Sequence, residues 1–318
     1  RCNNNCIWCR GGHRNFMATE NDLDVKVMKR VVKELADYGV KGIVRFSGMT
    51  GEPLMNEGTL GAIRTGIDLG LNVGLITNGI LLDSKARDYL IDSTYVSVSL
   101  DAGTSKTFNN LKGHSTEVFE VILNNMKRFA ELRRDRESKT RFGAGFMIHP
   151  GNYFEAVAAA KRVKETGADM IQFKVPYFLG SAAFTQEHLP AVLRSLEEAR
   201  EYSDDNFKVF FMQQKGEQEK ELTGLLPKPD FQKCYAQFIN GVIAASGKVY
   251  PCVHFGYNTG LSGQAMGDVY NESFKEIWEG DKRAKMIDKI CPSSDCSICN
   301  RYDTRMNIFL DFLSEKGL

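Results

Sequence analysis

The 318-residue chain lacks long apolar runs, and none of its stretches approaches the roughly 20 consecutive apolar residues of a membrane-spanning helix. It also lacks an excess of charge of either sign, because 41 Lys and Arg residues stand against 40 Asp and Glu residues and leave a formal net charge of +1. Without a net field, neither nucleic acid nor a membrane surface is an expected partner. No secretory signal precedes the first cysteine, so the cytoplasm is the expected compartment.

The sequence also does not favour disulfides. The eight cysteines fall in two groups at spacings typical of metal ligands, in a chain whose length and 42% hydrophobic content suffice to bury a core. A chain of this size does not need disulfides for stability, so we expect reduced thiolates. The length suits one large domain with an appendage.

The first group of cysteines is Cys2, Cys6 and Cys9, on a loop at the start of the chain. Three thiolates so close in sequence can bind three irons of a four-iron, four-sulfur cluster and leave the fourth iron open. An open coordination position distinguishes catalytic metal sites from structural ones. The alternative is a structural zinc site completed by His13, although the paired Cys-x-x-Cys arrangement usual for zinc is absent here.

Strands and helices are expected to alternate along most of the chain, which favours a parallel sheet covered by helices. The expected strands are Gly42–Ser47, Asn72–Thr77, Tyr95–Asp101, Arg141–His149, Asp169–Val175 and, in a connector, Phe207–Met212. The expected helices are Asn21–Tyr38, Leu54–Leu69, Ser84–Ile91, Thr116–Arg136, a helix capped by Asn152 that ends at Thr166, and Leu189–Tyr202.

Polar residues follow one face of these strands. The strand Tyr95–Asp101 alternates small polar with apolar residues, and if the sheet curves into a barrel the polar ones line the lumen. Ser99 and Asp101 stand at the C-terminal end of this strand, where α/β folds place ligand contacts. Lys174 ends another strand. Most lysines are simply solvated, but at a barrel mouth this one could hold a carboxylate of a substrate or cofactor.

The second group of cysteines follows residue 230. Cys234 and Cys252 flank two apolar runs around Ser246-Gly247, which predict a β-hairpin, and Cys296 and Cys299 form a Cys-x-x-Cys pair. Four thiolates would close one metal site, either an iron–sulfur cluster or a zinc ribbon. Cys291 is left over, as an unliganded thiol or an alternative ligand.

The spacing Cys2-x3-Cys6-x2-Cys9, with Trp8 before the last cysteine, resembles the signature of the radical S-adenosylmethionine enzymes. The resemblance implies an α/β fold, a partial (β/α)6 TIM-like barrel whose first strand would precede Arg1. It also implies a [4Fe–4S] cluster on the three cysteines, whose open iron chelates S-adenosylmethionine. A flavodoxin- or ferredoxin-type donor would supply the electron that cleaves this cofactor to a 5′-deoxyadenosyl radical, which abstracts a substrate hydrogen.

The same resemblance assigns cofactor contacts. Thr50-Gly51-Glu52-Pro53 is similar to the family's Gly-Gly-Glu-Pro motif, which meets the methionyl amino group, and Thr replaces the first glycine here. Ser99 corresponds to a serine that contacts the ribose or the carboxylate of the cofactor. The expected cofactor-binding residues are Trp8, Gly51, Glu52, Asn78, Ser99 and Lys174.

The C-terminal stretch resembles the SPASM and shorter twitch domains, which hold auxiliary clusters in radical S-adenosylmethionine enzymes. The similar features are the order Cys234, Gly247, Cys252 and the segment Gly267–Trp278, and five cysteines rather than seven fit the single-cluster twitch form. The resemblance implies a second [4Fe–4S] cluster on Cys234, Cys252, Cys296 and Cys299, and a catalytic role for Cys291 as a hydrogen donor, as in radical epimerases. The predicted domains are residues 1–180 (barrel), 181–230 (connector) and 231–318 (auxiliary cluster).

The predicted function is that of a radical oxidoreductase or epimerase that dehydrogenates or epimerises a small-molecule substrate, such as a sugar or aminocyclitol. The auxiliary cluster would accept an electron in an oxidation or relay one in a redox-neutral reaction. A peptide maturase that acts on a ribosomally made precursor is the alternative enzyme. A zinc-stabilised binding module is the non-enzymatic alternative, and it leaves the βα units and the Thr-Gly-Glu-Pro turn unexplained.

Overall fold

The computed structural model describes residues 1–9, 22–48, 51–114, 117–175, 184–211, 228–256, 258, 260–299 and 301–316. The chain forms two compact units, one made of residues 1–18 and 40–225 and the other of residues 19–39 and 226–318.

The first unit is built on a six-stranded parallel sheet with the order β1-β2-β3-β4-β5-β6. The strands are β1 (Ile43–Ser47), β2 (Asn72–Thr77), β3 (Tyr95–Ser99), β4 (Arg141–Met147), β5 (Met170–Lys174) and β6 (Lys208–Phe211). Sequential order in a parallel sheet means that each strand is reached by one crossover from its neighbour, so all C-terminal strand ends share one edge.

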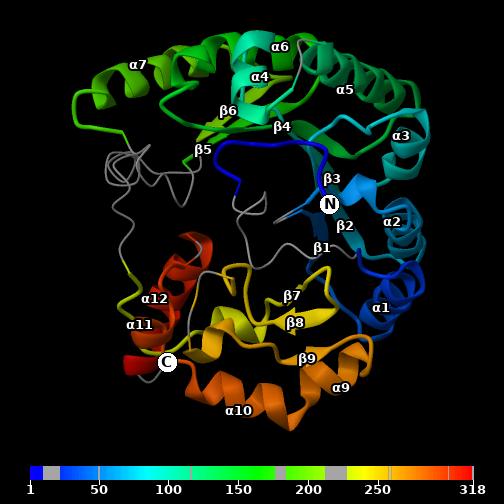
Figure 1. Cartoon of the computed structure of the whole chain (residues 1–318), viewed down its shortest axis with the longest axis vertical. Coiled ribbons are helices and arrows are strands. Elements are labelled where there is room, and N and C mark those ends of the chain that lie inside the picture. The colour runs from blue at the N-terminus through cyan, green and yellow to red at the C-terminus, as the bar shows by residue number, and fades with distance from the viewer. Residues whose placement is uncertain are drawn as a thin grey trace. The chain divides into compact units, whose positions relative to one another are not determined.

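Helices cover one side of this sheet (Figure 1). They are α2 (Thr59–Asp68), α3 (Ser84–Leu90), α4 (Ser105–Lys112), α5 (Glu117–Asp135), α6 (Ala156–Glu165) and α7 (Leu189–Arg200), with short 3₁₀ turns at Pro53–Met55 and Tyr153–Glu155. The core lies between the two layers, where alternate strand residues meet the apolar helix faces. Fully buried members include Leu75, Val98, Phe142, Phe146, Phe173, Ile63, Phe119, Phe129 and Val163.

The other side of the sheet is polar and partly exposed. Ser97 and Ser99 of β3 and Gln172 and Lys174 of β5 are half-buried, whereas the alternate residues of these strands are buried. Since successive strand residues point to opposite faces, this pattern confirms the sequence expectation of polar side chains along one face of the sheet.

Several expected elements differ in the structure. The strand expected in the connector is β6, which pairs in register with β5, so the sheet continues past residue 180. Helix α4 was not predicted. Asn152 does not cap a helix with its side chain, because its Oδ1 accepts from the amide of His149 at 2.7 Å. His13, Thr50 and Met212 lie outside the described residues, and a strand before Arg1 stays a prediction.

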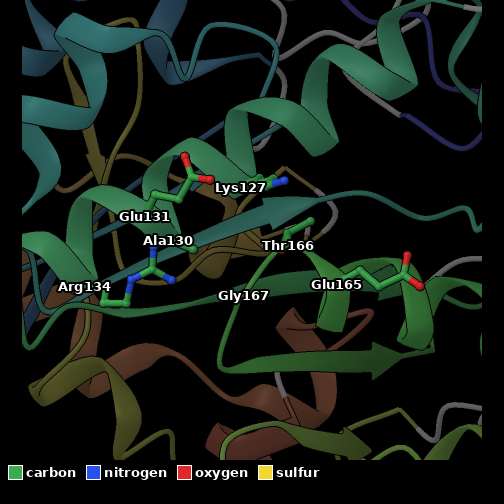
Figure 2. A pocket seen from close by; sticks show the side chains of 7 residues that line it. All are labelled: Lys127, Ala130, Glu131, Arg134, Glu165, Thr166 and Gly167. Atoms are coloured by element: carbon green, nitrogen blue, oxygen red, sulfur yellow. The ribbon is translucent and has the colours of Figure 1, made fainter.

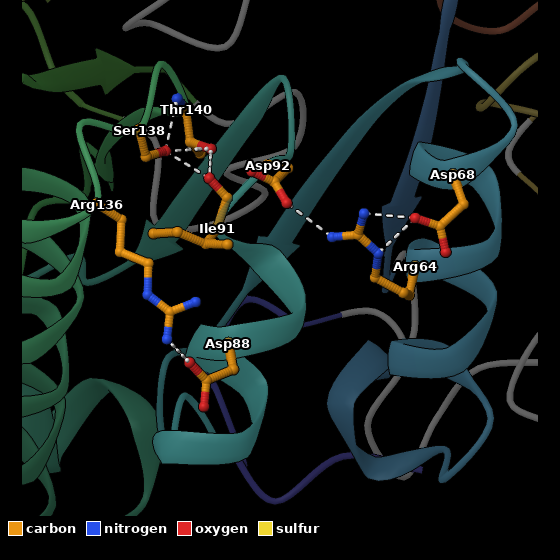
Figure 3. A network of polar contacts seen from close by, with 8 residues as sticks. All are labelled: Arg64, Asp68, Asp88, Ile91, Asp92, Arg136, Ser138 and Thr140. Carbon is orange, nitrogen blue, oxygen red and sulfur yellow. Dashed lines mark hydrogen bonds and ion pairs between the residues drawn. The ribbon is translucent and has the colours of Figure 1, made fainter.

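A polar network lies at the edge of the first unit's sheet that is formed by the N-terminal ends of the strands (Figure 3). Arg64 of α2 forms ion pairs with Asp68 and Asp92, and Arg136 pairs with Asp88. The hydroxyl of Thr140 donates to the carbonyl of Ile91 at 2.5 Å. This edge is opposite the C-terminal strand ends, and in barrels polar contacts there serve stability rather than chemistry.

The second unit contains a small antiparallel sheet of β7 (Val242–Ile243), β8 (Lys248–Tyr250) and β9 (Gly267–Asp268). The predicted hairpin is confirmed: β7 pairs with β8 through a turn in which Gly247 has φ +81°. A Cβ on Gly247 would lie 2.4 Å from the Tyr270 ring, so glycine suits both the turn and the packing. The helices of this unit are α1 (Val25–Asp37), α9 (Phe274–Glu279), α10 (Asp281–Lys289), α11 (Pro292–Asp295) and α12 (Arg301–Glu315).

Helix α1 belongs to the core of the second unit although it precedes the sheet in sequence. Val31 packs in one buried cluster with Val249, Val269, Ile277 and Met286. Each compact unit therefore combines segments that are far apart in the sequence, whereas each predicted domain (1–180, 181–230 and 231–318) is one continuous segment. These domain boundaries stay a prediction. Among the residues that the structure describes, no helix combines the length and the apolar character needed to cross a bilayer.

Candidate functional site

The cysteine loop is fixed by its backbone at the C-terminal end of α4. The amide of Asn5 donates to the carbonyl of Lys112 at 2.8 Å, and that of Ile7 donates to the carbonyl of Leu111 at 3.0 Å. These carbonyls belong to the last turn of a helix, where no intrahelical partner remains for them. The loop thus satisfies the helix end, and it holds Cys2, Cys6 and Cys9 as free thiols that are exposed or partly exposed.

The start of the loop is fixed by the turn that contains Glu52. The amide of Glu52 donates to the carbonyl of Arg1 at 2.8 Å, and a Cβ on Gly51 would lie only 2.6 Å from that oxygen. The close approach therefore requires glycine at position 51. Asn78, at the end of β2, donates from Nδ2 to Asn3 of the loop at 2.6 Å. Three of the predicted cofactor-binding residues are thus brought to the cysteine loop.

The buried Glu52 carboxylate accepts three hydrogen bonds from the described part of the chain. Its oxygens accept from the Thr77 hydroxyl at 2.6 Å and from the amides of Asn78 at 2.7 Å and Leu54 at 3.1 Å. Burial raises the pKa of Glu52, and these three hydrogen bonds oppose the rise. A carboxylate offers about four acceptor positions, so one remains for a further donor such as an amino group.

A buried ion pair lies beneath the loop. Lys112 and Asp101 have side chains only 3% and 5% exposed and pair with each other. Burial alone would lower the pKa of Lys112, but Asp101 and Cys6 raise it above the usual lysine value. The Lys112 ammonium also lies 5.2 Å from the centre of the Trp8 ring, so it contacts the loop through a cation–π interaction.

The backbone of Asp101 is held in a strained conformation, and hydrogen bonds fix its carboxylate and its carbonyl. Its φ is +59°, in the left-handed region that disfavours residues other than glycine. Its Oδ1 accepts from the amide of Met147 at 2.6 Å, and the side chain of Asn152 donates to its carbonyl at 2.8 Å. Strain of this kind, held by surrounding hydrogen bonds, is typical of functional sites.

Ser99 and Lys174 lie on the polar face of the sheet, on the two strands that flank β4. Ser99 is in register with Gly145 of β4, and a Cβ on that glycine would lie 3.8 Å from Lys174 Nζ. Among the described residues, none forms a hydrogen bond or ion pair with the Lys174 ammonium group. Burial lowers the pKa of Lys174, the Asp101 charge opposes this shift, and the Arg45 charge adds to it. Arg45 of β1 also opposes the burial that raises the pKa of Tyr95 on β3.

The second unit brings together Cys234, Cys252, Cys296 and Cys299. Burial raises the pKa of Cys252 to about 12, and the charges of the other three thiols add to this rise. Burial likewise raises the pKa of Cys296 to about 11 and of Cys299 to about 12. The ionised thiols of this group would therefore repel one another, and a bound cation would offset that repulsion.

Both thiol groups suit an iron–sulfur cluster. Each consists of soft thiolate donors, which select such clusters, and the second group is surrounded by N–H donors to sulfur. The backbone amide of His254 donates to Cys252 Sγ at 3.4 Å, and the amide of Asn4 donates to Cys2 Sγ in the same way at 3.4 Å.

Cys291 lies near the second thiol group without joining its hydrogen-bond pattern. Its thiol contacts Gln232 Oε1 at 3.1 Å and Ser293 Oγ at 3.2 Å. Hydrogen bonds from Ser293 and Ser294 lower the pKa of Cys291, and its charge slightly raises the pKa of Cys296.

The pocket on the helical side of the first unit is a separate feature. A pocket of about 220 Å³ lies between α5 and the turn that follows α6 (Figure 2). Its lining carries alternating charges and contains no cysteine; the residues are Lys127, Ala130, Glu131, Arg134, Glu165, Thr166 and Gly167. It contains none of the predicted site residues.

Sequence reasoning missed the residues that support the cysteines. Gly113, which has φ +70° and a Cβ position 3.0 Å from Asn5, marks the end of α4 in the sequence, but no local signal singles out Lys112. Asn258 and Asn307, which contact the sulfurs of the second group, carry no local signal in the sequence.

Comparison with known proteins agrees with this geometry. Residues 1–171 match the sequence model of the radical SAM superfamily, and residues 234–300 match that of an iron–sulfur cluster-binding domain known as SPASM. The chain is 27% identical to an AdoMet-dependent heme synthase of Methanosarcina barkeri, over 94% of this chain and 85% of that protein. It is 23% identical to a PqqA peptide cyclase of Bradyrhizobium diazoefficiens, over 89% of this chain and 71% of the relative.

A solved structure shares the fold. SuiB of Streptococcus suis, in its S-adenosylmethionine complex, aligns with a TM-score of 0.62 at 17% identity and covers 88% of this chain. The chain spans 63% of the length of SuiB. The family match assigns a [4Fe–4S] cluster and S-adenosylmethionine to the enzyme, and the second match adds an iron–sulfur cluster in place of the zinc alternatives. The chain therefore belongs to the radical S-adenosylmethionine superfamily and carries a SPASM-type cluster-binding domain.

Proposed function

We propose that the loop cysteines are the ligands of the catalytic cluster and that the second thiol group holds the auxiliary cluster. The catalytic ligands are Cys2, Cys6 and Cys9, and the auxiliary ligands are Cys234, Cys252, Cys296 and Cys299. The observation that carries the proposal is the fixing of a three-thiol loop on α4, next to the C-terminal ends of β2 and β3. Ligands bind at that edge in parallel α/β folds.

The residues of the chain position the reactants. When bound, the cluster and S-adenosylmethionine supply one-electron cleavage of the sulfonium and hydrogen abstraction from the substrate. Glu52 offers its remaining acceptor position to the methionyl amino group. Ser99 and Lys174, on the polar sheet face, offer a hydroxyl and an ammonium group to the cofactor or substrate. Trp8 and Asn78 hold the loop through Lys112 and Asn3.

The substrate that this face favours carries a carboxylate. Arg45, Lys112 and Lys174 contribute three positive charges, whereas Asp101 is the one carboxylate that influences Lys174 among the described residues. Asp101 is already paired with Lys112, so the charge of Lys174 is left without a near counter-ion among the residues that the structure describes. An anionic substrate would relieve the cost of burying this cation.

The positive charge of this face favours one part of the small-molecule class expected from the sequence. An aminocyclitol brings cationic amino groups, which Arg45 and Lys174 would repel, and a plain sugar brings no charge. One relative is named for heme synthesis, and heme carries two propionate carboxylates. We therefore favour a carboxylate-bearing small molecule over a sugar as the substrate.

Lys174→Met tests the anion site with heme as a probe and heme dimethyl ester as its matched neutral control. The wild-type chain should bind heme at least about tenfold more tightly than the diester, and the variant should lose that preference, because a hydrogen bond to a charged group contributes about 1.5–3 kcal/mol. Binding is followed by quenching of tryptophan fluorescence. Lys127→Met, on the helical side, is the control variant.

The pH dependence gives a second readout. Only protonated Lys174 attracts a carboxylate, so heme affinity should fall as the pH rises through the pKa of Lys174, which burial holds below that of an ordinary lysine. The fall should be absent in Lys174→Met. If the variant weakens binding of S-adenosylmethionine and leaves heme unaffected, the lysine serves the cofactor carboxylate. Equal affinity for heme and its diester in the wild type would contradict the anion site.

A peptide substrate is the second candidate. It is favoured by the likeness to a peptide cyclase, and the SuiB fold is also known in a complex with its precursor peptide SuiA. An acidic side chain would satisfy Lys174 as a small carboxylate does. Transfer of deuterium from a labelled candidate into 5′-deoxyadenosine distinguishes the two classes.

The remaining partners follow from the chemistry. We propose a flavodoxin- or ferredoxin-type donor for the electron, and the cytoplasm as the compartment, because thiolate ligands require reducing conditions. We also propose Cys291 as a hydrogen-atom donor to a substrate radical. Its S–H bond would break as the substrate C–H bond forms, and the thiol would be restored by one electron from the flavodoxin- or ferredoxin-type donor and a proton from solvent.

A further inference from the structure

Two buried carboxamides lie against the sulfurs of the second thiol group. Asn307 of α12 is fully buried, and its Nδ2 is 3.7 Å from Cys234 Sγ. Asn258 is 8% exposed, and its Nδ2 is 3.9 Å from Cys252 Sγ. Both contacts fall within the range of a hydrogen bond to sulfur. Two of the four proposed ligands thus face the side chain of an asparagine.

The orientation of each carboxamide is fixed by backbone donors. Oδ1 of Asn307 accepts from the amides of Tyr235 at 2.7 Å and Ala236 at 3.0 Å. A backbone N–H can only donate, so the carbonyl oxygen must face these amides and the NH₂ group must face the sulfur. A flipped amide would place two donors against each other and leave the sulfur facing an acceptor.

Asn258 is oriented in the same way by the segment between the other two ligands. Its Oδ1 accepts from the amide of Ser297 at 3.0 Å and from that of Ile298 at 3.4 Å. Both residues lie between Cys296 and Cys299. Asn258 therefore connects Cys252 to the Cys-x-x-Cys pair, whereas Asn307 connects Cys234 to α12.

We propose that Asn258 and Asn307 are positioning residues that hold the ligands of the auxiliary cluster and raise its reduction potential. The proposal rests on the ligand assignment made above. An N–H group that donates to a thiolate withdraws electron density from the sulfur and stabilises the reduced, more negative state of a cluster. With both donors fixed by backbone contacts, this stabilisation needs no rearrangement when the electron arrives.

Asn307→Asp and Asn258→Asp test the proposal in the full-length chain. Aspartate has the same shape and keeps the oxygen that accepts from the backbone, but it replaces the NH₂ donor by an acceptor with a negative charge. The changes are made in a Cys2, Cys6, Cys9→Ala chain, reconstituted anaerobically with iron and sulfide, so that only the auxiliary cluster contributes. Its midpoint potential is measured by redox titration followed by electron paramagnetic resonance.

Each Asp variant should shift the midpoint potential downward, and the double variant should shift it further. Asn271→Asp is the matched control, because Asn271 is exposed and its side chain makes no contact with a sulfur; it should leave the potential near that of the parent chain. Asn307→Ser removes the donor without adding charge and should give a smaller shift of the same sign. If an Asp variant fails to hold its cluster, the midpoint potential of Asn307→Ser decides the test.

The outcomes separate the two proposals. A parent chain that holds no auxiliary iron would overturn the ligand assignment on which the inference rests. A parent chain with its cluster, and Asn307 and Asn258 variants whose potentials match those of the parent or of Asn271→Asp, would overturn the inference itself. Circular dichroism of the variants shows that any shift comes from a folded chain.

Discussion

Cys6 illustrates how single residues of this enzyme depend on their surroundings. Burial raises the pKa of its thiol to about 11, the Lys112 charge opposes the rise, and the Asp101 charge adds to it. A thiol in this setting is protonated near neutral pH, and as one of the proposed ligands Cys6 would lose its proton when iron binds. The Lys112 charge, which opposes the rise of the pKa, would favour that thiolate.

Cys291 stands apart from the two groups of proposed ligands, and its thiol contacts the side chains of Gln232 and Ser293. In D₂O, with a substrate that delivers hydrogen to 5′-deoxyadenosine, a thiol donor would transfer solvent deuterium to the product. Cys291→Ala should lose most of that label and at least about tenfold in turnover. Full turnover with unchanged product stereochemistry in this variant would rule out the donor role. Cys291→Ser, which keeps the size and the hydrogen bonds, is the control for folding.

The site residues that could be predicted from the sequence differ from those that could not in how far apart in the chain their contacts lie. The cysteines and the Gly51-Glu52 turn were predictable because their spacing along the chain carries the signal. Lys112 and Asn307 were not, because their importance comes from Asp101 and Cys234, which lie 11 and 73 residues away. A lysine or an asparagine on a helix is usually a solvated residue, so its sequence neighbours give no reason to single it out.

At the scale of elements, α4 is the support of the cysteine loop. Its N-terminus is clamped by Glu155, whose carboxylate accepts from the amide of Gly103 at 2.8 Å and from the hydroxyls of Thr104 at 2.6 Å and Thr107 at 2.8 Å. Its C-terminus carries the loop. The helix spans only Ser105–Lys112, too short for a clear apolar period, which is why it was missed. Its local signals were Thr104 before it and Gly113 after it.

Lys112→Met tests whether the ion pair between Lys112 and Asp101 stabilises α4 and the cysteine loop that it carries. The methionine keeps the apolar stem but leaves Asp101 buried without its partner, which should cost about 3–5 kcal/mol of unfolding free energy. Urea unfolding of the apoprotein, followed by Trp8 fluorescence in a Trp278→Phe background, measures the loss. The double change Lys112→Met with Asp101→Asn removes both charges and should recover much of it. A change below about 0.5 kcal/mol in Lys112→Met, as expected of an exposed lysine, would show that the pair does not support the loop.

The strands were the most predictable elements, since each is a short run rich in apolar residues and, in β3 and β5, buried and partly buried residues alternate. Sequence reasoning predicted β6 as a strand but placed it in a connector, because charged and polar residues surround it. Pairing with β5 at Ile171 and Phe173, together with the buried Val209, makes it part of the sheet. Whether a short strand joins a sheet depends on tertiary pairing of this kind, and the residues of the strand alone do not predict it.

At the scale of the whole molecule, each compact unit contains one thiol group. The first is exposed or partly exposed on the sheet unit, as an open cluster requires, and the second is built among N–H donors in the unit that contains α1. The balance of 41 basic and 40 acidic residues fits an enzyme that recognises its substrate through a few local charges rather than an overall field.

Formation of 5′-deoxyadenosine tests the central claim most directly. The reconstituted wild-type chain, reduced with dithionite and supplied with S-adenosylmethionine, should hold about eight irons and release 5′-deoxyadenosine and methionine. The Cys2, Cys6, Cys9→Ala chain should keep about four irons and release none. Wild-type protein that fails to cleave the cofactor, or a triple variant that cleaves it at the wild-type rate, would contradict the account.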